Sequence, residues 1–282
     1  MDIETRDALG IHYTSEKDIL KLLEPLFLTE LRNKYNLCKY NKQKLEILLE
    51  EIQNIKILDP ACGCGNFLIL SYRELRLLQT EILKSIALIN EKYSNEPHLQ
   101  LKLNVISSVL DVDSMFGFEI DELASRIAQI ALWLVDHQLN TTISIEFNEN
   151  CVRLPLKKSP NIYNINALRI NWSDYININT ITYIVGNPPY IPANNRSKDQ
   201  MKDMNIVFNR TSFKRFRKLD YVSAWFYKTA EFIKYTSVKA AFISTNSITQ
   251  GEQVAYLWKP LINSHLIINF AHKTFCMEKR AK

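Results

Sequence analysis

The chain has 282 residues, of which 46% are hydrophobic and 23% are charged, and its formal net charge is +5. This length can bury one sizeable core. No run of about 18 uninterrupted apolar residues predicts a membrane span, and the charged N-terminus MDIETRDALG does not look like a secretory signal. The five cysteines are irregularly spaced, which favours a reduced, cytoplasmic protein. No second Cys or His pair accompanies Cys62 and Cys64 at zinc spacing, so we expect no metal site.

Helical and strand-like patterns alternate along the chain. A first helix is predicted from Ser15, which fits a capping box with Asp18. Apolar residues at helical spacing predict helices over residues 15–31, 44–52, 71–93, 121–139, 221–235 and 252–262. Apolar and β-branched runs predict strands at 55–59, 114–120, 165–170, 182–186, 238–245 and 265–271. We find no convincing domain boundary, and the alternation predicts an α/β fold with an open, mostly parallel sheet and helices on both faces.

Two unusual loops follow predicted strands. DPACGCGNF (59–67) follows the first strand, and NPPY (187–190) ends the fourth, where two prolines cannot donate ladder hydrogen bonds. In doubly wound sheets, ligands bind beyond the carboxyl ends of the strands, where the strand order reverses. With the order 3-2-1-4-5, the first and fourth strands are neighbours at that point. We therefore expect the two loops to face each other across one crevice.

The first loop is rich in glycine in a chain that has only six glycines, where average usage would give about 20. It lacks the third glycine of a dinucleotide site and the Gly-Lys-Ser/Thr of a triphosphate site, so its ligand is not expected to be held by phosphates. Glu119 ends the second predicted strand, where it could hold a ribose diol or be a solvated carboxylate. A ligand with ribose, adenine and a methionine-like tail would be S-adenosylmethionine (SAM).

DPACGCGNF, FEID (118–121) and NPPY resemble motifs I, II and IV of amino-directed DNA methyltransferases, and residues 10–27 resemble motif X in the gamma-class order. With NALRINW (166–172), LDYVSAWFYKTAEFI (219–233) and FAHKTF (270–275), the chain resembles the MmeI-like (type IIL) restriction–modification methyltransferases.

The resemblance implies a Rossmann-like class I, SAM-dependent catalytic domain over residues 1–282. A motif X helical part would occupy 1–50 and the core 51–282. The implied activity is methyl transfer to the N6 amino group of adenine in double-stranded DNA, within a restriction–modification system.

The resemblance also implies the residues that contact the cofactor. Tyr13 and Thr14 would lie near the methionine moiety, and Glu119 and Ile120 would hold ribose and adenine. The central loop would be lined by Asp59, Ala61, Gly63 and Gly65. Asn166 and Ala167 would meet the adenine edge. For Ile120, Asn166 and Ala167, ordinary strand-end packing is the alternative interpretation.

The NPPY segment suits chemistry on an amine. The exocyclic nitrogen of adenine is a poor nucleophile, because its lone pair is delocalised into the ring. The Asn187 side-chain oxygen and the Pro188 carbonyl could accept its two hydrogens and free that lone pair. Pro188 and Pro189 fix the carbonyl direction in advance, and Tyr190 offers a ring for stacking a flipped base. A structural Asn-Pro turn is the alternative.

Residues 196–218 hold eight basic side chains against two carboxylates. Such a run is a solvated face or a surface that contacts a polyanion. We expect it to grip the DNA backbone beside the flipped base through Arg196, Lys198, Arg210, Lys214, Arg215, Arg217 and Lys218. Phe275 is expected to supply the second aromatic face for that base.

The chain departs from the family pattern at several positions. Ile165 stands where the family has glycine, Asn171 where it has aspartate, and Met277 where it has tryptophan. The seventh strand, the target-recognition domain and the nuclease are expected to be missing, so the chain would be a fragment or half of a split enzyme with a separately encoded recognition subunit. Two alternatives stay open: a methyltransferase acting on a protein glutamine or RNA, and a catalytically silent SAM-binding or DNA-contacting remnant.

Overall fold

The computed structural model describes residues 14–93, 110–147, 159–209, 215–264 and 266–272. Its centre is a five-stranded sheet in the order β3-β2-β1-β4-β5, with every neighbouring pair parallel. The strands are β1 Ile57–Asp59, β2 Met115–Glu119, β3 Asn161–Asn164, β4 Tyr183–Gly186 and β5 Lys239–Phe242. The predicted order is confirmed, and the reversal lies between β1 and β4.

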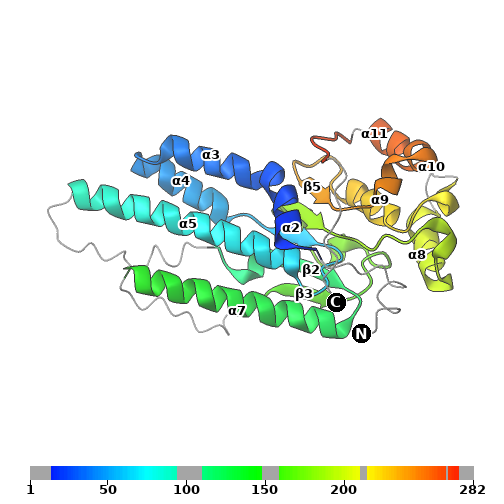
Figure 1. The fold of residues 1–282 in the computed structure, drawn as a ribbon, viewed down its shortest axis with the longest axis horizontal. Helices are drawn as coiled ribbons and strands as arrows, with labels where there is room; N and C mark the ends of the chain where they lie inside the picture. The colour runs from blue at the N-terminus through cyan, green and yellow to red at the C-terminus, as the bar shows by residue number, and fades with distance from the viewer. Residues whose placement is uncertain (1–13, 94–109, 148–158, 210–214, 265, 273–282) are drawn as a thin grey trace.

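Long helices cover one face of the sheet (Figure 1). They are α2 Glu16–Leu23, a π-helical turn η1 Glu24–Leu28, α3 Thr29–Cys38, α4 Lys42–Gln53, α5 Asn66–Tyr93 and α7 Glu122–Phe147. Ser15 caps α2 by accepting a hydrogen bond from the Asp18 backbone N–H at 3.2 Å, which confirms the predicted helix start. Successive strand residues point to opposite faces, so Ile57 packs under these helices while Leu58 faces the other layer.

A buried polar network links α5 to α7. The Arg76 side chain is fully buried, and its Nη1 donates to Asp136 Oδ1 at 3.0 Å. The Tyr72 hydroxyl donates to the same carboxylate at 2.6 Å, and Arg76 Nη2 donates to Asn140 Oδ1 at 2.7 Å. Because a buried charge is costly without partners, this network holds the two helices in one register.

The opposite face is covered by an irregular segment before β4 and by the end of α9 Ser223–Phe232. Trp172 is buried there, with its ring centroid 5.3 Å from that of Phe232. Its indole Nε1 donates to the Ala167 carbonyl at 2.9 Å. Aromatic packing therefore closes this side of the sheet with little regular secondary structure.

The third predicted strand was placed wrongly. Residues 165–170 form turns, and the strand lies earlier, at Asn161–Asn164. The physical reason is that the Asn166 side-chain oxygen accepts a hydrogen bond from the Leu168 backbone N–H at 2.9 Å. Such a local side-chain bond competes with the sheet ladder and turns the chain.

The last part of the chain forms shorter elements. They are α8 Lys198–Phe208, a 3₁₀ turn η6 Phe216–Lys218, α10 Gly251–Gln253, a π-helical turn η8 Val254–Trp258 and α11 Lys259–Asn263. Further 3₁₀ turns are Val112–Ser114, Trp172–Asp174, Ile178–Thr180, Ala193–Asn195 and Asn246–Thr249.

The strand predicted at 265–271 is wrong where the structure describes it: residues 266–272 have no ladder partner, and Ile267 is exposed. An apolar pattern alone cannot tell a strand from an irregular segment whose apolar side chains pack against the core, as those of Leu266 and Phe270 do. No helix within the described ranges has both the length and the apolar character needed to cross a membrane.

Candidate active site

The loops after β1 and β4 lie against each other. Asp59 ends β1 and Gly186 ends β4, and a Cβ built on Gly186 would lie 2.6 Å from Asp59 Oδ1. Only glycine leaves room for that carboxylate. This contact confirms that the two unusual loops share one edge of the sheet, as the strand order predicts.

Backbone conformation shapes the first loop. Asp59 Oδ1 accepts a hydrogen bond from the Ala61 N–H at 3.0 Å, which starts the turn. Gly63 and Gly65 have φ angles of +55° and +87°, a region that side chains rarely adopt. A Cβ on Gly65 would also lie 3.0 Å from the Ala128 Cβ of α7, whereas the space beside Gly63 is open. The loop therefore packs tightly on one side and exposes its backbone on the other.

Glu119 joins this loop to the end of β2. Its Oε2 accepts from the Gly63 N–H at 2.7 Å and its Oε1 from the Asp121 N–H at 2.8 Å. Burial raises the pKa of this carboxyl group. Each oxygen keeps a second acceptor direction, so the carboxylate can still receive the hydroxyls of a ribose. The ribose role of Glu119 stays a prediction, and the bond to Gly63 was not foreseen from the sequence.

Asp59 carries an unsatisfied acceptor. The residue is 1% exposed, and its Oδ2 is buried without a hydrogen-bond partner among the described residues. Burial, with a smaller contribution from the negative charge of Glu119, raises the pKa of Asp59 to about 8. A cationic ligand group beside Oδ2 would favour the charged carboxylate and remove this penalty.

Asn187 presents a second unsatisfied acceptor. Its Nδ2 donates to the Thr14 hydroxyl at 2.8 Å, and its Oδ1 is buried without a partner in the described part of the chain. Tyr190 is half-buried, and burial raises the pKa of its phenol against the opposing effect of a hydrogen bond from Asn187. Pro188 is buried between them. The segment thus holds an amide oxygen ready for a donor, next to an aromatic ring.

The residues expected at the adenine edge have other partners too. Asn166 Nδ2 donates to Asp203 Oδ2 at 3.3 Å, and Ala167 is buried with its carbonyl accepting from Lys228 Nζ at 2.6 Å. Ile120 is 68% exposed at the end of β2, although its side chain is apolar. An exposed apolar side chain at a strand end is available to a ligand.

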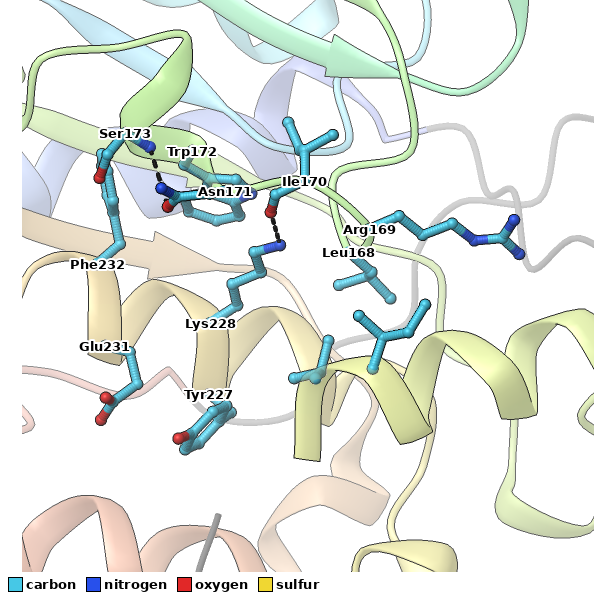
Figure 2. Close-up of a pocket in the computed structure, with 12 residues that line it drawn as sticks. Leu168, Arg169, Ile170, Asn171, Trp172, Ser173, Tyr227, Lys228, Glu231 and Phe232 are labelled. Atoms are coloured by element: carbon cyan, nitrogen blue, oxygen red, sulfur yellow. Dashed lines mark hydrogen bonds between the residues drawn. The ribbon is translucent and has the colours of Figure 1, made fainter. Parts of the chain in front are cut away.

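Behind this turn lies a cavity of about 420 Å³ that sequence reasoning missed. Residues 168–173 line it together with α8 and α9, and Lys228 reaches from α9 to the Ile170 carbonyl (Figure 2). Burial lowers the pKa of Lys228 to about 8. A lysine within the apolar stretch AWFYKTAEF is the only sequence signal for it.

The basic segment is only partly free to meet a ligand. Lys198, Arg215, Arg217 and Lys218 are exposed, although Lys218 pairs with Glu252. Arg196 is half-buried and donates to the carbonyls of Ala193 and Arg217.

The aromatic residues described in this segment pack inward. Phe208 is buried and its ring stacks on that of Phe216 with centroids 5.5 Å apart. Four of the expected site residues lie outside the described residues: Tyr13, Arg210, Lys214 and Phe275. Among the described residues, no group of three or more His, Cys, Asp or Glu side chains could hold a metal ion.

A family model for the MmeI DNA-methyltransferase domain matches residues 35–282. The chain belongs to this family.

Relatives of this MmeI-type domain are much longer proteins. DNA methyltransferase A of Bacillus subtilis (strain 168) is 38% identical over 283 residues, which cover 99% of this chain and 31% of the relative. The type IIL restriction-modification enzyme MmeI, solved in complex with DNA, superposes on this chain with a TM-score of 0.91 at 43% identity. The match covers 100% of this chain and 36% of the MmeI chain.

A putative type II restriction enzyme and methyltransferase of Methanocaldococcus jannaschii is 33% identical over 107 residues, 38% of this chain and 8% of the relative. The chain therefore spans about a third of the length of the first two relatives.

Proposed function

We propose that this chain is the catalytic domain of a DNA methyltransferase that transfers a methyl group from SAM to the N6 amino group of adenine. The observation that carries the proposal is the buried Oδ1 of Asn187, which has no hydrogen-bond partner among the described residues and lies beside Pro188 and Tyr190 in the chain. Residues 1–282 would form one catalytic unit, with 1–50 as its helical N-terminal part and 51–282 as its core. The enzyme would belong to a cytoplasmic restriction–modification system.

The residues of the first loop fit SAM. The unpartnered Asp59 Oδ2 suits the ammonium of the methionine moiety, and Glu119 suits the ribose hydroxyls. Ile120 supplies an exposed apolar surface for adenine. The other proposed contacts are Tyr13, Thr14, Ala61, Gly63, Gly65, Asn166 and Ala167. When bound, SAM supplies a methyl group made electrophilic by its sulfonium.

The protein's own contribution is to prepare the amine. Asn187 Oδ1 and the Pro188 carbonyl accept the two hydrogens of the flipped adenine, which draws its nitrogen toward tetrahedral geometry. Pro188 and Pro189 hold that carbonyl in place before the base arrives, so little reorganisation remains. Tyr190 stacks on the base. With SAM bound, the nitrogen lone pair would form the new bond to the methyl carbon as the bond from that carbon to sulfur breaks. S-adenosylhomocysteine would leave with the electron pair of the broken bond, and the surplus proton on nitrogen would leave to solvent, so no strong base is required.

Double-stranded DNA is the proposed partner. The exposed Lys198, Arg215, Arg217 and Lys218 suit phosphate contacts, with Arg196, Arg210, Lys214 and Phe275 as further proposed contacts. Phosphate contacts bring affinity and salt dependence but not sequence choice. Sequence choice would come from another part of a longer polypeptide or from a separate recognition subunit, because the Bacillus subtilis relative and MmeI are each about three times as long as this chain.

The test uses isotope-labelled SAM and duplex DNA of mixed sequence, with any recognition partner supplied. We expect label in N6-methyladenine after digestion. Asn187→Ala should still bind S-adenosylhomocysteine and lose transfer by about 100-fold or more, as when an oxyanion-hole donor is removed. Asn33→Ala, at an exposed position of α3, is the matched control and should keep full activity. Label in protein or RNA alone would refute the proposal, and an active Asn187→Ala enzyme would refute the role of that residue.

A further inference from the structure

Asp203 is a buried carboxylate on α8, in the middle of the basic segment. The residue is 2% exposed, although its neighbours Lys198 and Lys202 on the same helix are exposed. A buried carboxylate is costly unless several donors satisfy it. The position of Asp203 therefore depends on the groups around it.

Three donors from two other parts of the chain meet this carboxylate. Arg169 Nε donates to Oδ1 at 2.5 Å, and the Tyr221 hydroxyl donates to Oδ2 at 2.6 Å. Asn166 Nδ2 donates to Oδ2 at 3.3 Å. Burial and the charge of Asp203 both raise the pKa of Tyr221, so its hydroxyl keeps the proton that it donates.

The bond from Asn166 Nδ2 to Asp203 Oδ2 fixes the orientation of the Asn166 amide. Nitrogen must face Asp203, which leaves the amide oxygen to accept from the Leu168 N–H at 2.9 Å. The backbone bond from Arg169 N to the Asn166 carbonyl, 3.0 Å long, completes the turn. Asp203 thus holds both ends of the turn that carries Asn166 and Ala167.

Tyr221 extends this contact to the segment that follows NPPY. Its backbone N–H donates to the Ile191 carbonyl at 2.9 Å, directly after Tyr190. One carboxylate on α8 therefore lies behind both the adenine-edge turn and the segment that follows NPPY. Figure 1 shows α8 next to α9 at one end of the molecule.

We propose that Asp203 is a positioning residue that holds the adenine-edge turn against α8, so that the cofactor pocket and the DNA-contacting segment are formed together. This inference rests on the proposed function. It predicts that cofactor and DNA favour each other's binding, because each ligand stabilises one side of the same contact.

The experiment measures the affinity of S-adenosylhomocysteine by calorimetry, with and without a DNA duplex, for the wild type and Asp203→Asn. We expect DNA to raise the wild-type affinity about fivefold or more, the lower end of ordinary coupling. Asp203→Asn should weaken S-adenosylhomocysteine binding about tenfold, because one charged hydrogen bond to the turn is lost. The same change should abolish the effect of DNA on this affinity and keep kcat at saturating SAM within about threefold of the wild type. Asp199→Asn, an exposed carboxylate on the same helix, is the matched control and should behave as the wild type.

Arg169→Gln removes one donor whose side chain is 44% exposed and serves if Asp203→Asn does not fold. It should show the same losses in smaller degree. The inference is overturned if DNA and S-adenosylhomocysteine bind independently in the wild type, or if Asp203→Asn and Arg169→Gln both retain the effect of DNA. A wild type that binds no DNA even with its recognition partner supplied would instead overturn the proposed function.

Discussion

The indole Nε1 of Trp225 donates a hydrogen bond to the carbonyl of Pro60 at 3.1 Å, although 165 residues separate them. Trp225 is buried on α9, and Pro60 follows Asp59 in the glycine-rich loop. The bond holds the loop after β1 against α9, a helix that lies far from the loop in the sequence. It explains how a loop with so many small residues keeps one conformation.

Trp225→Phe should loosen this loop. The change keeps most of the apolar volume but leaves the Pro60 carbonyl without its buried donor, which costs about 1–3 kcal/mol. We expect a lower unfolding temperature and weaker binding of S-adenosylhomocysteine, measured by calorimetry. Trp258→Phe loses an equivalent bond, to the Ile248 carbonyl at 2.8 Å, and should lower stability without weakening that binding. Equal losses of affinity in both variants would argue against a specific role for Trp225.

Thr14→Val should lower the rate of methyl transfer more than it lowers the affinity for the cofactor. Valine fills the same space, but it cannot accept the hydrogen bond from Asn187 Nδ2 that holds the amide in place. One lost hydrogen bond of about 1–1.5 kcal/mol corresponds to about a tenfold lower kcat. Thr14→Ser keeps the hydroxyl and should restore the rate, as single-turnover assays at saturating SAM would reveal. If valine and serine give the same rate, the hydroxyl has no such role.

The affinity of the site for a cofactor analogue that carries an ammonium group should depend on pH through Asp59. The pKa of Asp59 is raised to about 8, so below that pH its carboxyl group is protonated in the free protein. Pairing of Asp59 with the ammonium of the ligand must release this proton. Binding therefore tightens as pH rises, by up to about tenfold per pH unit between pH 6 and 7.5. Titration calorimetry with S-adenosylhomocysteine in buffers of different ionisation enthalpy measures both affinity and proton release. Asp59→Asn should bind weakly and without this slope; a slope retained in that variant would assign the proton to another group.

Arg76→Met should destabilise the fold without touching the crevice. It leaves Asp136 buried without its cation, and breaking such a pair costs about 3–5 kcal/mol. Urea unfolding followed by circular dichroism measures the loss. The control is Arg126→Met, which breaks an exposed i,i+4 pair with Glu122 and should cost less than about 1 kcal/mol. Similar midpoints for the two variants would mean that the buried network contributes little.

The sequence by itself determined the parallel α/β sheet, its strand order and the meeting of the loops after β1 and β4. The sheet follows from alternating apolar periodicities, and the two loops follow from glycines that need positive φ and prolines that must end a strand. The strand order follows from the general rule for doubly wound sheets. The proposed role of the NPPY segment also comes from the sequence, because the groups it uses lie in adjacent residues.

Only the tertiary structure decided where the third strand lies, because the Asn166 side chain turns the chain where an apolar pattern predicted a ladder. It also revealed the bond from Asn187 to Thr14 across 173 residues and the donors that gather around Asp203. Such contacts leave no local signal, since a polar residue is the same in sequence whether its partner is water or a distant side chain. Folding alone determines which polar groups are buried together and which, such as Asn187 Oδ1, are buried without a hydrogen-bond partner among the described residues.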